Sequence, residues 1–205
     1  DNYFIHVGAE EAILNLFLAT INAGDRIVVN SPTYESLAEI PRALGAEVIN
    51  WNWRQTRTDG KCRWALDPDE LPGLSGGKAK FIIMNTPHNP TGGHLTREEM
   101  DATIAYARQT GAVILSDEVY RRLEHAPQRL LPPVWHLYEN GISLDVLSKH
   151  SGLPGLRIGW LASQRQDILE KVAVIKDYNS ICASAPSELL AAIAVRNMDK
   201  IVARN

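Results

Sequence analysis

The sequence is poor in cysteine and has no cluster of basic residues. Its 205 residues include two cysteines, Cys62 and Cys182, which lie far apart and are not joined by a second pair at metal-ligand spacing. This argues against a disulfide framework and against a cysteine-rich zinc site. The formal net charge is -3. Without runs of lysine and arginine, neither nucleic acid nor an anionic membrane is an expected partner.

Long apolar stretches and a secretion signal are also missing. No segment approaches the roughly 18 apolar residues of a membrane-spanning helix. The N-terminal DNYFIHVGAEEAILNL lacks the basic start and the small-residue cleavage site of a signal peptide. With 45% hydrophobic and 22% charged residues, the chain has the composition of a globular protein with a sizeable core. We therefore expect a cytoplasmic protein that makes no membrane contact.

What the sequence does contain is an alternation of strand and helix patterns. Short β-branched runs predict strands at residues 4–7, 26–30, 47–53, 80–84, 113–116, 143–147 and 156–162. Helical periodicity predicts helices at residues 10–21, 35–44, 97–109, 167–176 and 187–202. The third helix has the clearest boundaries, with a capping box of Thr96 and Glu99 at its start and Gly111 after its end. The polar stretch 54–67 is interpreted as a loop.

This order of elements predicts an α/β fold. Strands that alternate with helices form a mostly parallel sheet covered on both faces, here a three-layer sandwich with seven strands. Only residues 149–155 separate the last two predicted strands, which is too short for a parallel crossover, so one strand is expected to be antiparallel. Lys149 then lies at the carboxyl end of a strand, where open α/β sheets bind their ligands.

Two cations near this point are candidates for chemistry. Burial of Lys149 would lower its pKa and supply the neutral amine that Schiff-base formation needs. Arg157, inside the apolar LPGLRIGWLA, is expected to be partly buried and to need a carboxylate or phosphate partner. The alternatives are a solvated surface lysine and a structural ion pair.

Groups that could bind a ligand follow four other predicted strands. In NTPHNPTGG (85–93), Asn89 lies in a rigid loop and its amide can donate to a ligand; the alternative is a simple turn. In VILSDEVY (113–120), Asp117 is either a helix cap or a site group, and Tyr120 could share the site. Gly8 turns into a helix whose first amides could hold a phosphate. Tyr34, in NSPTYES, could stack on a planar ligand or pack in the core.

The joint pattern is more specific than its parts. The segments SPTY, NTPHNPTG, SDEVY and SKHSGLPGLRIGW, in this order, resemble the class I/II aminotransferases of the fold type I pyridoxal-phosphate enzymes. DYNSICASAPSELLA, at 177–191, is similar to the family as well. The resemblance implies that residues 1–205 are a cofactor-binding large domain without the family's N-terminal arm and C-terminal small domain. It also implies a homodimer.

The resemblance assigns a role to each candidate. Lys149 would form the Schiff base with the cofactor aldehyde and then move a proton from the substrate Cα. Asp117 would pair with the pyridinium nitrogen. The remaining contacts would be Asn89 and Tyr120 to the phenolic oxygen, Tyr34 to the ring face, and the amides after Gly8, at Ala9 and Glu10, with Ser148 and Arg157 to the phosphate. Two positions depart from the family pattern, because Val146 and Ala9 replace residues with hydroxyl groups.

The implied activity is transfer of an amino group from an amino acid to a 2-oxo acid. Two alternatives stay open: another pyridoxal-phosphate reaction, such as elimination or decarboxylation, and a non-catalytic remnant or sensor domain. A generic nucleotide-binding sheet is disfavoured, because no GxGxxG follows the first predicted strand.

Overall fold

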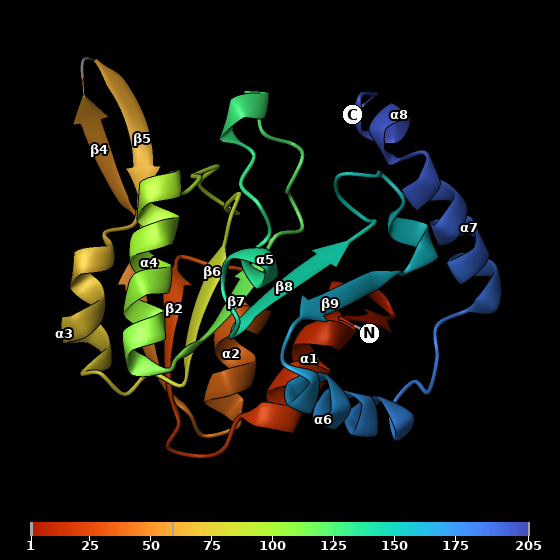
Figure 1. Cartoon of the computed structure of the whole chain (residues 1–205), viewed down its shortest axis with the longest axis horizontal. Helices are drawn as coiled ribbons and strands as arrows, with labels where there is room; N and C mark the ends of the chain where they lie inside the picture. Colours follow the sequence, from red (N-terminus) through yellow and green to blue (C-terminus); the bar gives the residue numbers. More distant parts are fainter. Residues whose placement is uncertain (1, 59, 205) are drawn as a thin grey trace.

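The computed structural model describes residues 2–58 and 60–204, and its centre is a seven-stranded sheet (Figure 1). The strands, in sheet order, are β1 (Tyr3–His6), β9 (Gly159–Ser163), β8 (Gly141–Val146), β7 (Val113–Asp117), β6 (Phe81–Asn85), β2 (Arg26–Ser31) and β3 (Glu47–Asn52). From β8 to β3 all neighbours are parallel, while β9 runs antiparallel to both β8 and β1. The predicted α/β fold with one antiparallel strand is confirmed.

Helices cover both faces of the sheet. One layer holds α1 (Gly8–Thr20), α2 (Ser36–Ala43) and α6 (Gln166–Asp177), and the other holds α3 (Leu71–Ser75), α4 (Arg97–Thr110) and α5 (Val134–Leu137). Successive strand residues serve opposite layers: Ile27 packs with the α1 layer and Val28 with the α4 layer. Burial of β2 on both faces explains why Ile27, Val28 and Val29 are all apolar rather than alternating with polar residues.

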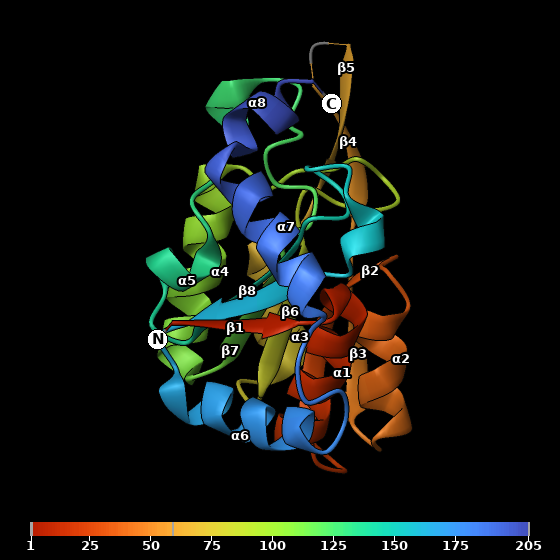
Figure 2. The ribbon, with the colours of Figure 1, turned by 90° about the vertical axis from the view of Figure 1, so that its right-hand side faces the viewer.

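Two further helices lie outside these layers. In Figure 2, α7 (Ala185–Arg196) and α8 (Met198–Val202) rise along the side of the sheet near β8 and β1. Ala191 packs in a small apolar cluster with Leu147 and Ile158. The single helix predicted at 187–202 is therefore wrong in one respect, because the helix breaks at Asn197. No helix within the described residues is long and apolar enough to span a bilayer.

The connection from β8 to β9 is as short as expected, and Val146 pairs with Gly159 in an antiparallel register. The predicted start of the last strand at residue 156 is wrong. Pro154–Leu156 form a 3-10 turn, and Arg157 follows with a left-handed φ of 52°. Because of this turn, β9 begins only at Gly159. The capping box of Thr96 and Glu99 on α4 is confirmed.

The segment interpreted as a polar loop is instead a two-stranded antiparallel hairpin. It consists of β4 (Arg54–Thr58) and β5 (Lys61–Ala65), while Asp59 lies outside the described residues. The hairpin stands apart from the main sheet (Figure 1), so most of its side chains face solvent and give no apolar pattern. Trp64, which packs partly against the α4-side core, is its one large apolar contact among the described residues.

Candidate functional site

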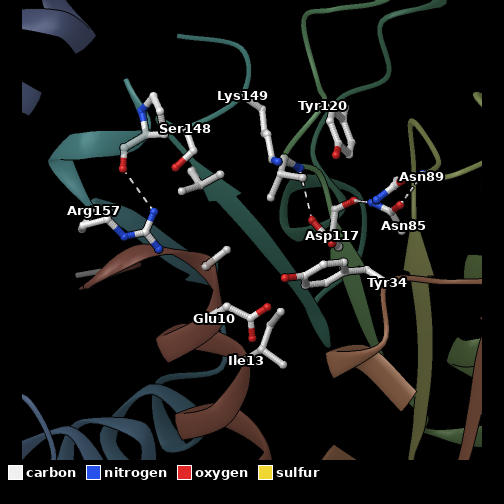
Figure 3. A pocket seen from close by; sticks show the side chains of 14 residues that line it. Glu10, Ile13, Tyr34, Asn85, Asn89, Asp117, Tyr120, Ser148, Lys149 and Arg157 are labelled. Atoms are coloured by element: carbon white, nitrogen blue, oxygen red, sulfur yellow. Dashed lines mark hydrogen bonds between the residues drawn. The ribbon is translucent and has the colours of Figure 1, made fainter. Parts of the chain in front are cut away.

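A cavity of about 240 Å³ lies at the carboxyl ends of β6, β7 and β8, beside the first turn of α1 (Figure 3). The predicted site residues that line it are Ala9, Glu10, Tyr34, Asn89, Asp117, Tyr120, Ser148, Lys149 and Arg157. Gly8 lies directly behind Arg157. Residues separated by almost 150 positions in sequence are thus brought to one place, because parallel strands deliver their ends to a common edge.

Asp117 forms the floor of the cavity. It is the last residue of β7, is 3% exposed, and accepts a hydrogen bond from Val119 N at 3.3 Å through Oδ1. Burial raises the pKa of this carboxyl group to about 7, while the charge of Lys149 acts weakly in the opposite direction. A cationic donor placed in the cavity would favour the carboxylate form of Asp117.

Glu118, the next residue, has a different environment. Its Oε1 accepts hydrogen bonds from Val134 N at 2.9 Å and from Ser143 Oγ at 2.8 Å, and it does not line the cavity. Burial raises the pKa of Glu118 to about 7 as well. Successive residues along an extended chain point to opposite faces, so only Asp117 of this acidic pair faces this cavity.

Asn89 is held at the cavity by a residue that the sequence reasoning missed. Asn89 N donates to Asn85 Oδ1 at 2.7 Å, and Asn85 Nδ2 donates to Asp117 O at 3.1 Å. Asn85 itself lines the cavity (Figure 3). The signal for it was a buried, polar last residue on an otherwise apolar strand.

Lys149 lies at the tip of a tight loop above the sheet edge. Its Nζ is 5.6 Å from the centroid of the Tyr120 ring, and both side chains line the cavity. Lys149 is exposed, so of the two possibilities considered from the sequence the structure shows the solvent-accessible lysine and not the buried one. Hydrogen bonds from Gly152 N to Lys149 O and from Leu153 N to Leu147 O close the loop and raise Lys149 beyond the end of β8.

Arg157 and the start of α1 form a cradle for an anion. Arg157 is exposed rather than partly buried as expected, and its Nη1 donates to Pro154 O at 3.2 Å. A Cβ at Gly8 would lie 2.5 Å from Arg157 Nη2, and Gly8 has a φ of 81°. Glycine at this position therefore lets the guanidinium lie over the first turn of α1, where the unpaired helix amides and the helix dipole favour an anion.

Tyr34 crosses the cavity toward Glu10 (Figure 3). Hydrogen bonding to the Glu10 carboxylate raises the pKa of Tyr34 to about 12, and burial adds to the effect. Glu10 Oε1 also accepts from Ser36 Oγ at 3.0 Å. Only the backbone amide of Glu10 had been considered from the sequence, so the role of this side chain is a finding of the structure.

Comparisons with known proteins agree with this geometry. The sequence profile of the family described as aminotransferase class I and II matches residues 1–202. Capreomycidine synthase of Streptomyces vinaceus is 31% identical over 95% of this chain and 48% of its own length. Kynurenine–oxoglutarate transaminase 3 of Homo sapiens is 30% identical over 95% of this chain and 45% of its own. A PLP-dependent aminotransferase structure from Streptococcus suis superposes with a TM-score of 0.89 at 34% identity, covering 100% of this chain and 52% of that one.

The chain belongs to the class I and II aminotransferases, a family that depends on pyridoxal phosphate. It spans about half the length of the curated relatives that it matches. The cavity suits this cofactor by its donor set. It offers a cradle for a phosphate between Gly8 and Arg157, a buried carboxyl group that would accept from a protonated ring nitrogen, and a lysine amine nearby.

Proposed function

We propose that this chain is the cofactor-binding large domain of an aminotransferase that transfers the amino group of an amino acid to a 2-oxo acid. The observation that carries the proposal is the convergence, on one cavity, of the Lys149 amine, the buried Asp117 carboxyl group and the cradle beneath Arg157. Bound pyridoxal phosphate supplies an electron sink for the negative charge that develops at the substrate Cα.

The protein side chains hold the two ends of that cofactor. Ser148, Arg157 and the amides of Ala9 and Glu10 bind the phosphate, where Arg157 supplies both charge and directed hydrogen bonds. At the other end, Asp117, whose pKa burial raises to about 7, would accept from the ring nitrogen, and this contact would lower the pKa and keep the carboxylate ionised.

The faces and edges of the ring are contacted by other residues. Asn89 and Tyr120, which line the cavity, would bond the phenolic oxygen, and Tyr34 would contact the ring. Asn85 orients Asn89 through its backbone amide. These groups follow the ends of β6, β7 and β2, so the parallel strands bring them to the same side of the sheet.

Lys149 is the residue that acts in the reaction. Its amine would hold the cofactor at the aldehyde carbon, and as a free amine it would accept and return the proton at the substrate Cα. An exposed loop tip leaves the lysine free to change between these two positions.

The assembly that we propose is a cytoplasmic homodimer. Apolar side chains of α7 are exposed, with Leu189 at 66%, Leu190 at 51% and Ile193 at 50%. Faces of this kind are normally covered by protein. The rest of the protein or a second subunit would supply the cover.

A second candidate function is a different reaction on the same cofactor. It is favoured by the 31% identity with capreomycidine synthase across 95% of the chain. The cavity residues hold the cofactor rather than the substrate side chain, so they serve both candidates equally.

Product analysis distinguishes these functions. The full-length protein is incubated with pyridoxal phosphate, a panel of amino acids and 2-oxoglutarate, and products are identified by mass spectrometry. We expect a new 2-oxo acid together with glutamate. Formation of an eliminated, cyclised or decarboxylated product without glutamate supports the second candidate, and cofactor binding without any product indicates a sensor or remnant.

A further inference from the structure

The loops that carry Tyr34 and Asn89 leave the sheet side by side without backbone pairing between them. Strands β2 and β6 pair only from Ile27 to Val29 on one strand and from Phe81 to Ile83 on the other. Beyond this point the ladder no longer fixes the distance between the two chains. At the strand ends Asn30 Nδ2 donates to Asn85 O at 3.5 Å. Further out, another contact must set the separation of the loops themselves.

The side chain of His88 supplies that contact. It is 3% exposed, its Nε2 lies 2.7 Å from Pro32 O, and its Nδ1 lies 2.6 Å from Thr91 Oγ1. A carbonyl oxygen can only accept, so Nε2 carries the proton and Nδ1 accepts from the Thr91 hydroxyl. Thr91 Oγ1 accepts in turn from Gly93 N at 3.0 Å. The ring therefore links two loops whose residues are 56 positions apart.

The ring has little freedom to move. It stacks on Trp53 with the ring centroids 4.7 Å apart and the planes inclined by 26°. The His88 backbone is bonded on both sides, from its own N to Gly93 O and from Gly92 N to its O, each at 2.8 Å. Burial lowers the pKa of His88 to about 4, which keeps the ring neutral and preserves this pattern of donors and acceptors near neutral pH.

We propose that His88 is a positioning residue that fixes the distance between Tyr34 and Asn89. Pro32 precedes Tyr34 by two residues, and Asn89 directly follows His88, so the hydrogen bond to Pro32 O transmits the position of one loop to the other. The hydrogen bond to Thr91 Oγ1 fixes the ring within its own loop. His88 does not line the cavity and acts through its neighbours. The inference rests on the proposed function, since its consequence is a preorganised contact with the cofactor ring.

The first test uses His88→Phe in the full-length protein. Phenylalanine keeps a planar ring for Trp53 and removes both hydrogen bonds. We expect the Kd for pyridoxal phosphate, measured by fluorescence titration, to rise about tenfold, which equals about 1.4 kcal/mol for the lost links. His88→Gln, whose amide can still donate toward Pro32 O, should recover part of the affinity.

A matched control separates positioning from general destabilisation. Ile104 is buried in the α4 layer and does not line the cavity. Ile104→Ala should lower the melting temperature at least as much as His88→Phe while leaving the cofactor Kd unchanged. An unchanged Kd in His88→Phe, or an equal rise in Ile104→Ala, overturns the proposal.

A mutant cycle tests the route of the effect. In a background of Tyr34→Ala and Asn89→Ala, adding His88→Phe should raise the Kd less than twofold, because the groups it positions are gone. The same tenfold rise in that background would contradict action through Tyr34 and Asn89.

A measurement without cofactor keeps the two proposals separate. Hydrogen exchange at the amides of Asn89 and Gly92 should become at least tenfold faster in His88→Phe and stay unchanged in Ile104→Ala. Failure of the wild-type protein to bind pyridoxal phosphate would overturn the proposed function alone. Unchanged exchange in His88→Phe overturns the role of His88 whatever the wild type binds.

Discussion

Charged side chains at the amino ends of the parallel strands, here called the amino edge, have ion-pair partners, whereas those that line the cavity at the carboxyl ends, the carboxyl edge, have none among the described residues. At the amino edge, Arg26 pairs with Glu47 at 2.9 Å and Lys80 pairs with Asp25 at 2.6 Å. At the carboxyl edge, Lys149 and Arg157 form no ion pair with any described residue, and Asp117 is buried next to them. Charges that are satisfied within the fold stabilise it, whereas charges left without partners indicate a place for a ligand.

The largest expected effect concerns an ion pair that is buried. Charges are paired within the fold at buried positions such as this one as well as at the amino ends of the strands. Glu11, in the first turn of α1, pairs with Lys176 at 2.9 Å, and both side chains are at most 10% exposed. Glu11→Gln leaves Lys176 buried without its counter-ion, so the free energy of unfolding should fall by about 3–5 kcal/mol in urea titrations. Glu39→Gln, which breaks the exposed pair with Arg42, is the control and should change stability by less than about 1 kcal/mol. Equal changes in the free energy of unfolding for the two substitutions would contradict the difference between the buried and the exposed ion pair.

Asp117→Asn should stabilise the cofactor-free chain in a pH-dependent way. The pKa of Asp117 is raised from 3.8 to about 7 in the folded state. The contribution of Asp117 to the free energy of unfolding is therefore fully present below its unfolded-state pKa and is lost as the pH rises toward 7. Asparagine has no such dependence. The stabilisation by Asp117→Asn should therefore grow by about 2–3 kcal/mol between pH 5 and pH 8 in urea titrations. A difference that is the same at both pH values would contradict a buried, unpaired carboxyl group. In the same variant, cofactor binding should be severely weakened.

Arg157→Ala and Arg26→Ala compare the edges directly. Loss of Arg157 should raise the Kd for pyridoxal phosphate about 10- to 100-fold, because a charge-assisted contact to the phosphate is worth about 1.5–3 kcal/mol. Its melting temperature should not change. Arg26→Ala should leave the Kd unchanged and lower stability by less than about 1 kcal/mol. A raised Kd in Arg26→Ala together with an unchanged Kd in Arg157→Ala would show that Arg157 is not a ligand group.

The smallest effect concerns Glu10, the carboxylate beside the cradle. Glu10→Gln removes a negative charge near the expected phosphate, so the cofactor should bind about two- to fivefold more tightly, in line with one exposed charge pair. The pKa of Tyr34 should also fall from about 12 toward its ordinary value of 10, which ultraviolet titration can follow. Glu35→Gln, an exposed neighbour of Tyr34, serves as control. An unchanged Tyr34 pKa would rule out the hydrogen bond to Glu10.

The sequence predicts the central part of this molecule well because burial on both faces leaves a strong apolar signal. The length of the 149–155 connection also indicated the antiparallel β9, and polar residues after each apolar run indicated the cavity. Solvent exposure of Lys149 and Arg157 could not be predicted in this way, since it depends on a loop that rises above the edge and on a turn at residues 154–157.

Contacts between distant segments carry no local pattern at all. The pairing of His88 with Pro32 and of Asn85 with Asp117 exists only because three strands lie next to one another. The β4–β5 hairpin was not predicted from the sequence for a related reason, since its solvated strands lack the apolar alternation on which strand prediction rests.

The most direct test of the account is to locate the cofactor on the protein. The full-length protein is incubated with pyridoxal phosphate, reduced with borohydride and digested, and the labelled peptide is identified by mass spectrometry in the wild type, in Lys149→Ala and in the control Lys80→Ala. We predict a label on Lys149 in the wild type and in the control, and none in Lys149→Ala. A label on another lysine, or none in a folded wild-type protein, would contradict the assignment of this cavity as the cofactor site.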